Sequence, residues 1–409
     1  MAVLGLVLLV ALLTFFLGVL VWVVCEHFLT ADIPSDVQHP AKLRFLHCMF
    51  LYVTTLGNIF EKLGICSMPK FSCFVHDILQ RAKENPKVIV TKLHFGTIPV
   101  RLFQPKAESS SPRRGIIFYH GGAALFGSLD CYHNVCSFLA QKTDSVLLLV
   151  GYRKLPDYHF PVASLDCLAA TIHFLKALKS YGVDPSRVVA CGESIGGAVL
   201  ASITQTLVGR SDLPRIRAQV LIYPVIQVVN LQLPSFQQNK NVPFLDSKLM
   251  KLCICKYLAI NSSWWDAILN GAFIPLDTWN KYSKWLSPEN IPKRFKKKGY
   301  QQPKFPSPFN EAAYLETGHI LDVSISPLLA EDETIAQLPE AFLVSCENDL
   351  LRDHTLLYKK RLEDQGVPVT WYHVKDGIHG SLVLFKDNIF TLPCFSNIVN
   401  GVISFINGI

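Results

Sequence analysis

The sequence predicts an α/β fold with a mostly parallel central sheet and helices on both faces of that sheet. Two observations carry this prediction. Short β-rich runs alternate with helical patterns, with strands near 116–119, 146–151, 187–191 and 218–223 and helices over 164–180 and 196–209. A glycine-rich turn, Gly192 to Gly197, joins the third of these strands to the second helix. This regular alternation favours right-handed crossovers between parallel strands.

The chain begins with an uncharged apolar segment, Ala2 to Cys25, that is 24 residues long. As a helix it measures about 36 Å, which is enough to cross a hydrocarbon core of about 30 Å. A cleaved signal peptide is the alternative, but no lysine or arginine precedes the segment and no clean small-residue cleavage site follows it. We therefore expect residues 1–25 to form an uncleaved transmembrane signal-anchor.

Residues 26–90 are expected to form a membrane-proximal cap segment. They contain a second apolar stretch, Phe45 to Phe60, which has no formal charge but carries several polar side chains. This stretch is short for a membrane span. We expect a cap helix that lies at the membrane or over the functional site, followed by the main domain, residues 91–409.

A loop with a known chemical role follows the strand predicted for Gly115 to Tyr119. A His-Gly-Gly loop behind a strand, ahead of a Gly-x-Ser-x-Gly turn, is the oxyanion-hole element of lipases and esterases. Backbone N–H groups in such a loop stabilise the negative oxygen of a tetrahedral acyl intermediate. The predicted oxyanion hole consists of Gly121, Gly122, Ala123 and Ile195. His120 is expected to hold the loop by hydrogen bonds rather than to act as a base.

The turn around Ser194 has the sequence form of a nucleophile elbow. The β-rich run Arg187 to Cys191 precedes it, and a helical pattern, Ala198 to Val208, follows it. In such an elbow the serine takes a strained conformation and the glycines avoid collisions with the neighbouring strand and helix. An idle serine in a glycine-rich turn is the alternative. The strand-turn-helix context favours Ser194 as a nucleophile.

An acid and a base are expected after the serine, in the chain order Ser, Asp, His. Asp349 follows a predicted strand over 341–345, and His379 follows another over 367–374. Both therefore lie past the carboxyl ends of strands, where open α/β sheets place their sites. The rival residues are Asp353 and Glu347 for the acid and His354 and His373 for the base. We predict Asp349 and His379, because His373 lies inside a strand pattern and His354 begins a helix.

Residues from about 226 to 320 interrupt the alternation and are rich in proline and tryptophan. We expect this insertion to join the amino-terminal segment in a helical cap. Its tryptophans are Trp264, Trp265, Trp279 and Trp285. They form either the core of the cap or the lining of an acyl pocket. A strand, the acid, a second strand, the histidine and a helix over 393–407 complete the predicted fold.

The motifs together resemble the hormone-sensitive-lipase branch of the α/β-hydrolases, and within it the arylacetamide deacetylase-like membrane proteins. The resemblance covers nearly the whole chain and rests on Tyr119-His120-Gly121-Gly122, Tyr152-Arg153-Lys154-Leu155-Pro156, Phe160-Pro161, the elbow, Ser326-Pro327-Leu328, Asp349-Leu350-Leu351-Arg352-Asp353 and Gly377-Ile378-His379-Gly380. It implies an α/β-hydrolase fold. It also implies a cofactor-free serine carboxylesterase with Ser194, Asp349 and His379 as its triad, acting on apolar acyl esters or amides.

Three positions depart from the family pattern. Ala123 stands where the family usually has a third glycine, and Glu193 and Ile195 flank the serine where it usually has aspartate and alanine. A positive φ at Ala123 costs about 1 kcal/mol. Ile195 is bulky and is expected to crowd small or branched acyl groups. No triad atom is removed, but a weak or inactive hydrolase-fold protein that binds a hydrophobic small molecule remains the alternative.

The flanks of the apolar segment do not settle its orientation, because acidic residues precede Lys42 and Arg44. The resemblance implies a single-pass type II protein with a catalytic domain in the lumen of the endoplasmic reticulum. Asn261, in Asn261-Ser262-Ser263, is a glycosylation acceptor that only a lumenal domain would use.

Composition excludes several other classes of function. Twelve cysteines occur without a C-x-x-C pair or a Cys/His cluster at zinc spacing, so neither a metal nor a cofactor is expected. Most of these cysteines are expected to be buried free thiols. The net charge of +7 owes much to one run, Lys293 to Lys298, which is either a solvated loop or a contact for anionic lipid. No nucleic-acid signature is present, and the sequence does not indicate an oligomeric state.

Overall fold

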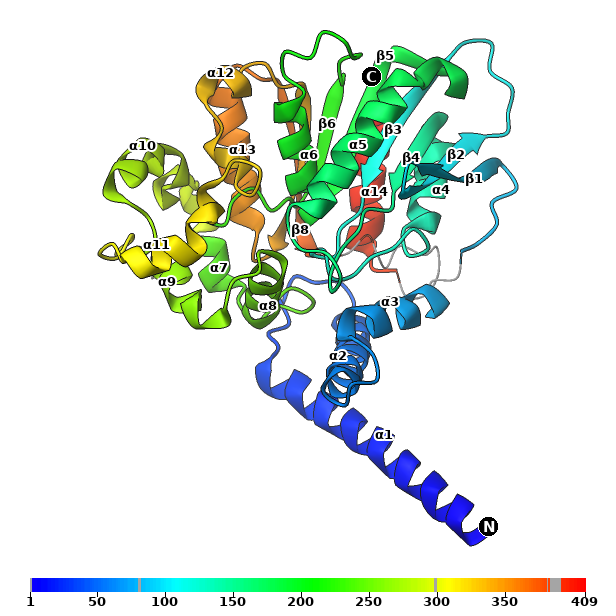
Figure 1. Ribbon diagram of the computed structural model, residues 1–409, viewed down its shortest axis with the longest axis vertical. Helices are drawn as coiled ribbons and strands as arrows, with labels where there is room; N and C mark the ends of the chain where they lie inside the picture. Colours follow the sequence, from blue (N-terminus) through cyan, green and yellow to red (C-terminus); the bar gives the residue numbers. More distant parts are fainter. Residues whose placement is uncertain (1, 80–81, 298–299, 381, 383–390) are drawn as a thin grey trace.

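A computed structural model describes residues 2–79, 82–297, 300–380, 382 and 391–409 (Figure 1). Its centre is one eight-stranded sheet with the strand order β1-β2-β4-β3-β5-β6-β7-β8. The strands are β1 (Val88–Phe95), β2 (Ile98–Pro105), β3 (Arg113–Tyr119), β4 (Ser145–Val150), β5 (Val183–Glu193), β6 (Ala218–Ile222), β7 (Glu340–Asn348) and β8 (Val369–Ile378). β2 pairs antiparallel with β1 and β4, and the other neighbouring strands pair parallel. The predicted mostly parallel sheet is confirmed.

Helices cover both faces of the sheet. They are α4 (His133–Lys142), α5 (Val162–Lys176), α6 (Ile195–Thr206), α13 (Arg352–Asp364) and α14 (Pro393–Asn407). Side chains of α5, α6 and α13 share one buried cluster, and those of α4 and α14 share the other. In β3, Ile117 and Tyr119 pack in the first cluster while Ile116 and Phe118 pack in the second, as the period of two along a strand requires.

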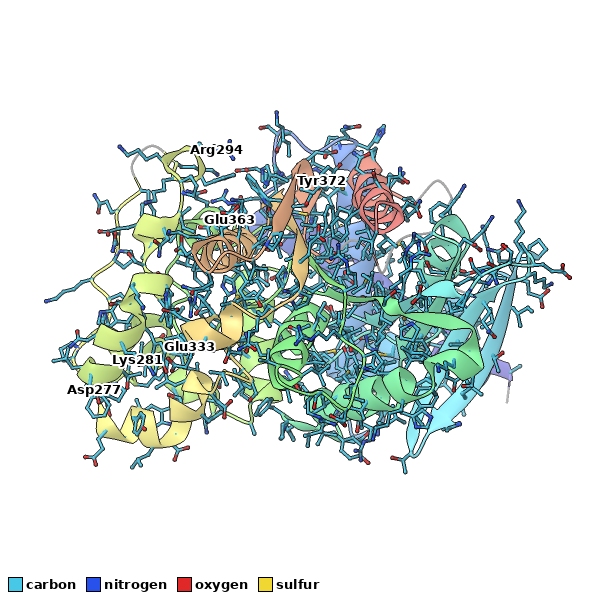
Figure 2. All side chains as sticks on the ribbon, turned by 90° about the horizontal axis from the view of Figure 1, so that it is seen from above. Asp277, Lys281, Arg294, Glu333, Glu363 and Tyr372 are labelled. Atoms are coloured by element: carbon cyan, nitrogen blue, oxygen red, sulfur yellow. The ribbon has the colours of Figure 1, made fainter. Side chains whose placement is uncertain are left out.

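The insertion between β6 and β7 forms a helical cap, as predicted. It contains α7 (Pro234–Gln238), α8 (Ser247–Tyr257), α9 (Trp265–Asn270), α10 (Leu276–Leu286) and α11 (Glu311–Thr317), and α12 (Asp332–Ile335) leads back to the sheet. Short 3₁₀ helices in the insertion cover Ser262–Trp264, Pro288–Asn290, Lys293–Phe295, Gly318–Leu321 and Pro327–Leu329, and one before β5 covers Leu178–Tyr181. Seen from above, α10 lies at the outer side of the cap, with Asp277 and Lys281 at its surface (Figure 2). Of the basic run, Lys298 lies outside the described residues.

The tryptophans of the insertion belong to the cap itself. Trp265 is buried, and the ring centroid of Trp279 lies 5.2 Å from that of Phe305. The guanidinium of Arg361 on α13 lies 3.6 Å from the ring centroid of Trp285. None of the four tryptophans lines either cavity beside Ser194. Of the two alternatives left open by the sequence, the structure therefore shows cap core rather than pocket lining.

Three helices precede the sheet: α1 (Ala2–Thr30), α2 (Pro40–Lys62) and α3 (Met68–Leu79). Figure 1 shows α1 extending away from the rest of the molecule, with α2 between α1 and the domain. The most apolar 18-residue window has a mean hydropathy of 3.0 in α1 and 1.2 in α2, and both helices are long enough to cross a membrane. Val19 and Val23 of α1 pack against Leu56 of α2. The apolar amino-terminal helix is compatible with a single-pass membrane anchor.

All twelve cysteines lie in the described residues and are free thiols, eight of them buried. This agrees with the expectation of buried free thiols for most of them.

Candidate active site

Ser194 occupies the sharp turn between β5 and α6. Its backbone has φ 53° and ψ −116°, a conformation that is strained for any residue with a side chain. A Cβ at Gly192 would lie 2.2 Å from the carbonyl oxygen of Gly196, and a Cβ at Gly196 would lie 2.2 Å from that of Tyr119. Only glycine fits at these two positions, so the turn has the predicted form of an elbow.

The three residues predicted as a triad are brought together at the carboxyl ends of β5, β7 and β8. Ser194 Oγ lies 2.8 Å from His379 Nε2, and His379 Nδ1 lies 2.9 Å from Asp349 Oδ2. The backbone N–H of Leu351 donates to Asp349 Oδ1 at 2.7 Å. All three side chains are buried. This arrangement lets His379 accept a proton from Ser194 while Asp349 fixes the orientation of the imidazole.

Three of the rival residues, Asp353, Glu347 and His373, take part in a separate network around Arg352. Asp353 Oδ1 accepts from Arg352 Nε at 2.9 Å, and Glu347 accepts from the same guanidinium at 2.9 Å. His373 Nε2 lies 2.9 Å from the other carboxylate oxygen of Glu347. His354 is buried in α13, and burial lowers its pKa to about 4. These contacts give the rivals structural partners in place of Ser194.

The loop after β3 has the backbone needed for an oxyanion hole. Gly122 has φ 103° and Ala123 has φ 55°, so the strain expected at this alanine is present. No described residue accepts a hydrogen bond from the N–H groups of Gly122, Ala123 or Ile195. The N–H of Gly121, by contrast, donates to the Tyr132 hydroxyl at 3.2 Å. The prediction that Gly121 belongs to the oxyanion hole is therefore corrected, because its donor is already used.

His120 has the surroundings of a residue that holds the loop. Its Nδ1 lies 2.8 Å from the carbonyl oxygen of Gly121, and its ring stacks on Tyr152 with centroids 4.2 Å apart. The Tyr152 hydroxyl donates to the His120 carbonyl oxygen at 2.8 Å. Burial lowers the pKa of His120 to about 3, so the ring is neutral near pH 7.

Glu193 is the centre of a buried hydrogen-bond network that links the loops around Ser194. Hydroxyls of Tyr132 and Tyr223 donate to its two carboxylate oxygens. Tyr132 also accepts the N–H of Gly121, and Tyr223 accepts the N–H of Leu382 at 3.2 Å. This network therefore connects the turn around Ser194 to the loop after β3 and to the segment after His379. Burial raises the pKa of Glu193, and the two tyrosine hydrogen bonds oppose that rise.

Replacing Glu193 by glutamine is expected to destabilise the protein. The amide nitrogen is a donor, so one buried tyrosine hydroxyl loses its acceptor at a cost of about 1–3 kcal/mol. The pKa of Glu193 is raised above 4.5 in the folded state, so the folded protein binds this proton more tightly than the unfolded chain does. The stability gained from protonation is therefore fully present below pH 4.5 and is lost as the pH rises through the folded pKa. Denaturant unfolding across this range measures both effects.

The free energy of unfolding of the wild type is thus expected to exceed that of Glu193→Gln by the largest margin at low pH. This margin should decrease as the pH rises. Glu340→Gln, which alters a part-exposed carboxylate paired with Arg217, serves as the control and should lack this trend. A pH-independent difference between wild type and Glu193→Gln would contradict the prediction.

Two apolar cavities meet at Ser194, and Ala123 and Leu245 also line both. The larger, about 200 Å³, is lined by α2 and α3 together with core and cap residues, among them Leu46, Met49, Phe50, Val53, Val75, Phe126 and Phe244. The smaller, about 80 Å³, is lined by Phe160, Ile195, Val225, Met250, Ile254 and Tyr257, among others. The second apolar stretch of the sequence thus lies over the candidate active site.

Comparison with known proteins agrees with the fold. A family model described as alpha/beta hydrolase fold matches residues 116–285 and 285–383. A solved carboxyl esterase from the fungus Tuber melanosporum has a TM-score of 0.60 and 20% identity, covering 80% of this chain and 88% of that one. A thermostable carboxylesterase from a metagenomic library has a TM-score of 0.62 and 22% identity, covering 83% of this chain and 97% of that one. At these identities the solved structures show the fold alone.

Curated relatives extend the comparison to activity. Arylacetamide deacetylase of Bos taurus is 36% identical over 87% of this chain and 90% of its own length. Neutral cholesterol ester hydrolase 1 of Mus musculus is 32% identical over 87% of this chain and 90% of its own length. Together with the fold, these matches define the class: the chain is an ester hydrolase of the α/β-hydrolase type.

The particular family follows from two further matches. Human arylacetamide deacetylase-like 4 is 70% identical over the full length of both chains, and human arylacetamide deacetylase-like 3 is 54% identical over 99% of each. The chain belongs to the arylacetamide deacetylase-like family, and the resemblance stated from its motifs is confirmed.

Proposed function

We propose that this protein is a serine carboxylesterase or deacetylase that hydrolyses lipophilic acyl esters or amides through Ser194, His379 and Asp349. The observation that carries the proposal is the continuous hydrogen-bond relay from Ser194 Oγ through His379 to Asp349, at the meeting point of two apolar cavities. A relay placed where apolar substrate groups converge suits acyl transfer from lipophilic compounds.

The reaction follows from the positions of these groups. His379 Nε2 takes the proton of Ser194 as Oγ attacks the carbonyl carbon, and the N–H groups of Gly122, Ala123 and Ile195 stabilise the resulting oxyanion. Collapse of this intermediate breaks the bond to the alcohol or amine, which leaves with the proton from His379. Water, deprotonated by the same histidine, then attacks the acyl-enzyme and releases the acid and free Ser194.

The cavities indicate the substrate class. Because each cavity is apolar and the two share Ser194, a bound ester would place one apolar group in each. The larger cavity suits a long or bulky group and the smaller one a short group. Ile195 lines the smaller cavity, which agrees with the expectation that it crowds branched groups.

Filling the larger cavity is expected to change selectivity. Val53→Trp places an indole against the cavity wall formed by α2. We expect kcat/KM to fall by about tenfold or more for esters with one long apolar chain and to change little for short esters, since 1.4 kcal/mol of lost contact corresponds to tenfold. Ile78→Trp adds the same ring at an exposed position of α3 outside both cavities and is the matched control. Equal losses for long and short esters would contradict the assignment.

We further propose that α1 anchors the protein in the endoplasmic reticulum membrane with the catalytic domain in the lumen. Supporting this topology, α1 carries no charged residue from Ala2 to Cys25, and Asn261 is exposed at the start of a short 3₁₀ helix. Exposed apolar side chains continue from α1 onto the α2–α3 region, at Leu63, Ile65 and Phe74, where membrane lipid would cover them. Glycosidase treatment that lowers the mass of wild type but not of Asn261→Gln supports a lumenal domain, and a cytosolic catalytic domain would contradict it.

Labelling by a fluorophosphonate probe tests the catalytic proposal directly. We expect the folded wild-type protein to label at Ser194 and the Ser194→Ala variant not to label, because the probe needs an activated serine. Circular dichroism confirms that both proteins are folded. Folded wild-type protein that never labels, yet still binds a hydrophobic ligand, would instead favour the non-catalytic alternative.

A further inference from the structure

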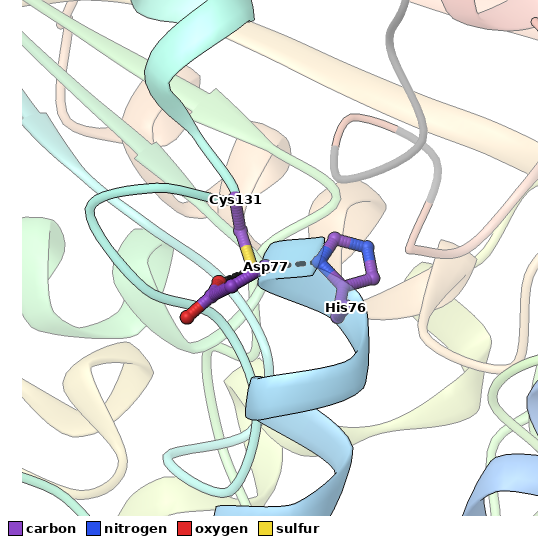
Figure 3. Close-up of side chains that lie close together, drawn as sticks. All are labelled: His76, Asp77 and Cys131. Carbon is purple, nitrogen blue, oxygen red and sulfur yellow. Dashed lines mark hydrogen bonds between the residues drawn. The ribbon is translucent and has the colours of Figure 1, made fainter. Parts of the chain in front are cut away.

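A cluster of three side chains joins the amino-terminal cap to the core beside the larger cavity. His76 and Asp77 lie on α3, and Cys131 lies just before α4 (Figure 3). His76 Nδ1 is 2.6 Å from Cys131 Sγ, and Cys131 Sγ is 3.0 Å from Asp77 Oδ1. The three ligand atoms all lie within 4.8 Å of one another. The active-site relay uses none of these residues.

The donor set is the kind that zinc binds. Zinc prefers thiolate sulfur, imidazole nitrogen and carboxylate oxygen, and this cluster supplies one of each. A thiolate and a carboxylate together neutralise a divalent cation, so the filled site would carry no net charge into its partly buried surroundings.

A second layer of hydrogen bonds orients two of the ligands. The Ser128 hydroxyl donates to Asp77 Oδ1 at 2.6 Å, and Ser128 Oγ accepts the backbone N–H of Cys131 at 3.0 Å. Metal ligands are commonly held by such outer partners. Ser128 therefore fixes the carboxylate and the cysteine relative to each other.

We propose that His76, Asp77 and Cys131 form a zinc-binding site that fastens cap helix α3 to the core. Binding displaces the thiol proton of Cys131 to solvent and forms the Zn–S bond, with water as the fourth ligand. Around a tetrahedral zinc, the nitrogen and sulfur ligands lie about 3.5 Å apart, given bond lengths of about 2.0 and 2.3 Å. The His76 and Cys131 side chains must therefore open slightly when the ion binds.

The site would act on the shape of the larger cavity. His76 itself lines that cavity, as do Cys73 and Val75 of the same helix. Cys131 follows the loop that carries Gly122 and Phe126 by only a few residues. A zinc ion here would hold the α3 wall of the cavity in a fixed position relative to the oxyanion loop.

Cobalt spectroscopy on the full-length, detergent-purified protein tests this proposal without any substrate. A Co²⁺ ion bound to a thiolate gives a sulfur-to-cobalt charge-transfer band. We expect one equivalent of Co²⁺ to produce this band and Zn²⁺ to abolish it by displacement. Cys131→Ser should lose the band, and Cys66→Ser, which removes a thiol from the α2–α3 connection, should keep it. His76→Ala should weaken metal affinity by at least about 100-fold, since losing an outer partner alone costs 10–100-fold.

Thermal unfolding provides a second measurement in case Cys131→Ser does not fold. Zinc should raise the unfolding temperature of wild type and Cys66→Ser but not that of Asp77→Asn. A wild-type protein that gives no charge-transfer band, a band that survives in Cys131→Ser, or an equal thermal shift in Asp77→Asn would overturn the proposal. These readouts are independent of hydrolysis, so failure here leaves the proposed esterase function untouched.

Discussion

Replacing Asp349 by asparagine is expected to lower kcat by about 10⁴-fold while leaving the fold intact. The reason lies in the two contacts of the carboxylate. Its Oδ1 accepts the N–H of Leu351 and its Oδ2 faces His379 Nδ1. The asparagine oxygen would remain on the Leu351 N–H, which turns its NH₂ group toward His379. The imidazole would then carry its proton on Nε2 and could not accept the proton of Ser194.

Steady-state kinetics on a soluble lipophilic ester measure this effect, with circular dichroism and protein concentration to determine the amount of folded enzyme. Asp353→Asn is the matched control, because Asp353 is the rival acid and lies four residues away. It pairs with Arg352 and with the backbone N–H of Ser235. Asp353→Asn should therefore lower stability but leave kcat per folded molecule nearly unchanged. Asp349→Asn protein with more than a tenth of wild-type kcat would refute the assigned role.

Replacing Gly122 by alanine is expected to lower kcat by 10²–10³-fold for each oxyanion donor that is displaced, or about 2.7–4 kcal/mol per donor. A Cβ at this position would lie 2.5 Å from the carbonyl oxygen of Phe126, at φ 103°. The N–H groups of Leu125 and Phe126 both donate to the Gly122 carbonyl oxygen. The new methyl group therefore pushes apart a turn that these hydrogen bonds hold closed.

The control for this variant is Gly182→Ala. Gly182 also has a positive φ, 68°, but a Cβ there would have no heavy atom within 4 Å. This change carries the backbone strain of about 1 kcal/mol without the collision. Comparing kcat and unfolding free energy of the two variants separates the effect on the oxyanion loop from the effect on stability. If both variants lose activity equally, the loop geometry is not responsible.

The parallel strands of the sheet, and the positions of Ser194, Asp349 and His379 just past the carboxyl ends of three of them, could be predicted because they depend on local patterns. Parallel strands appear as short apolar runs at regular intervals, and their carboxyl ends come together whatever the loops between them do. Several boundaries were wrong in detail: β5 begins at Val183 rather than at residue 187, α5 ends at Lys176 rather than at residue 180, and the strand expected to end at Val374 continues to Ile378. Gly377 permits this, since a Cβ there would lie 2.7 Å from Cys346 Sγ.

Features built from distant segments were not predictable. Glu193 was visible as an unusual charge beside Ser194, but its tyrosine partners lie 61 and 30 residues away. The loss of Gly121 as an oxyanion donor follows from the same tyrosine hydroxyl. Cys131 and His76 are 55 residues apart, so no spacing rule links them. Part of the wall of the larger cavity comes from α2 and α3, and no periodicity in the sequence specifies which cavity residues they contribute.

The placement of α2 has a practical consequence for anyone who wishes to prepare a soluble form of this enzyme. One side of this helix contributes Phe50 and Val53 to the cavity beside Ser194, and another side packs against α1 at Leu56. Deleting the first thirty residues would spare every reacting group. It would nevertheless leave one wall of the larger cavity without its support, so we expect selectivity measured on such a fragment to differ from that of the full-length protein.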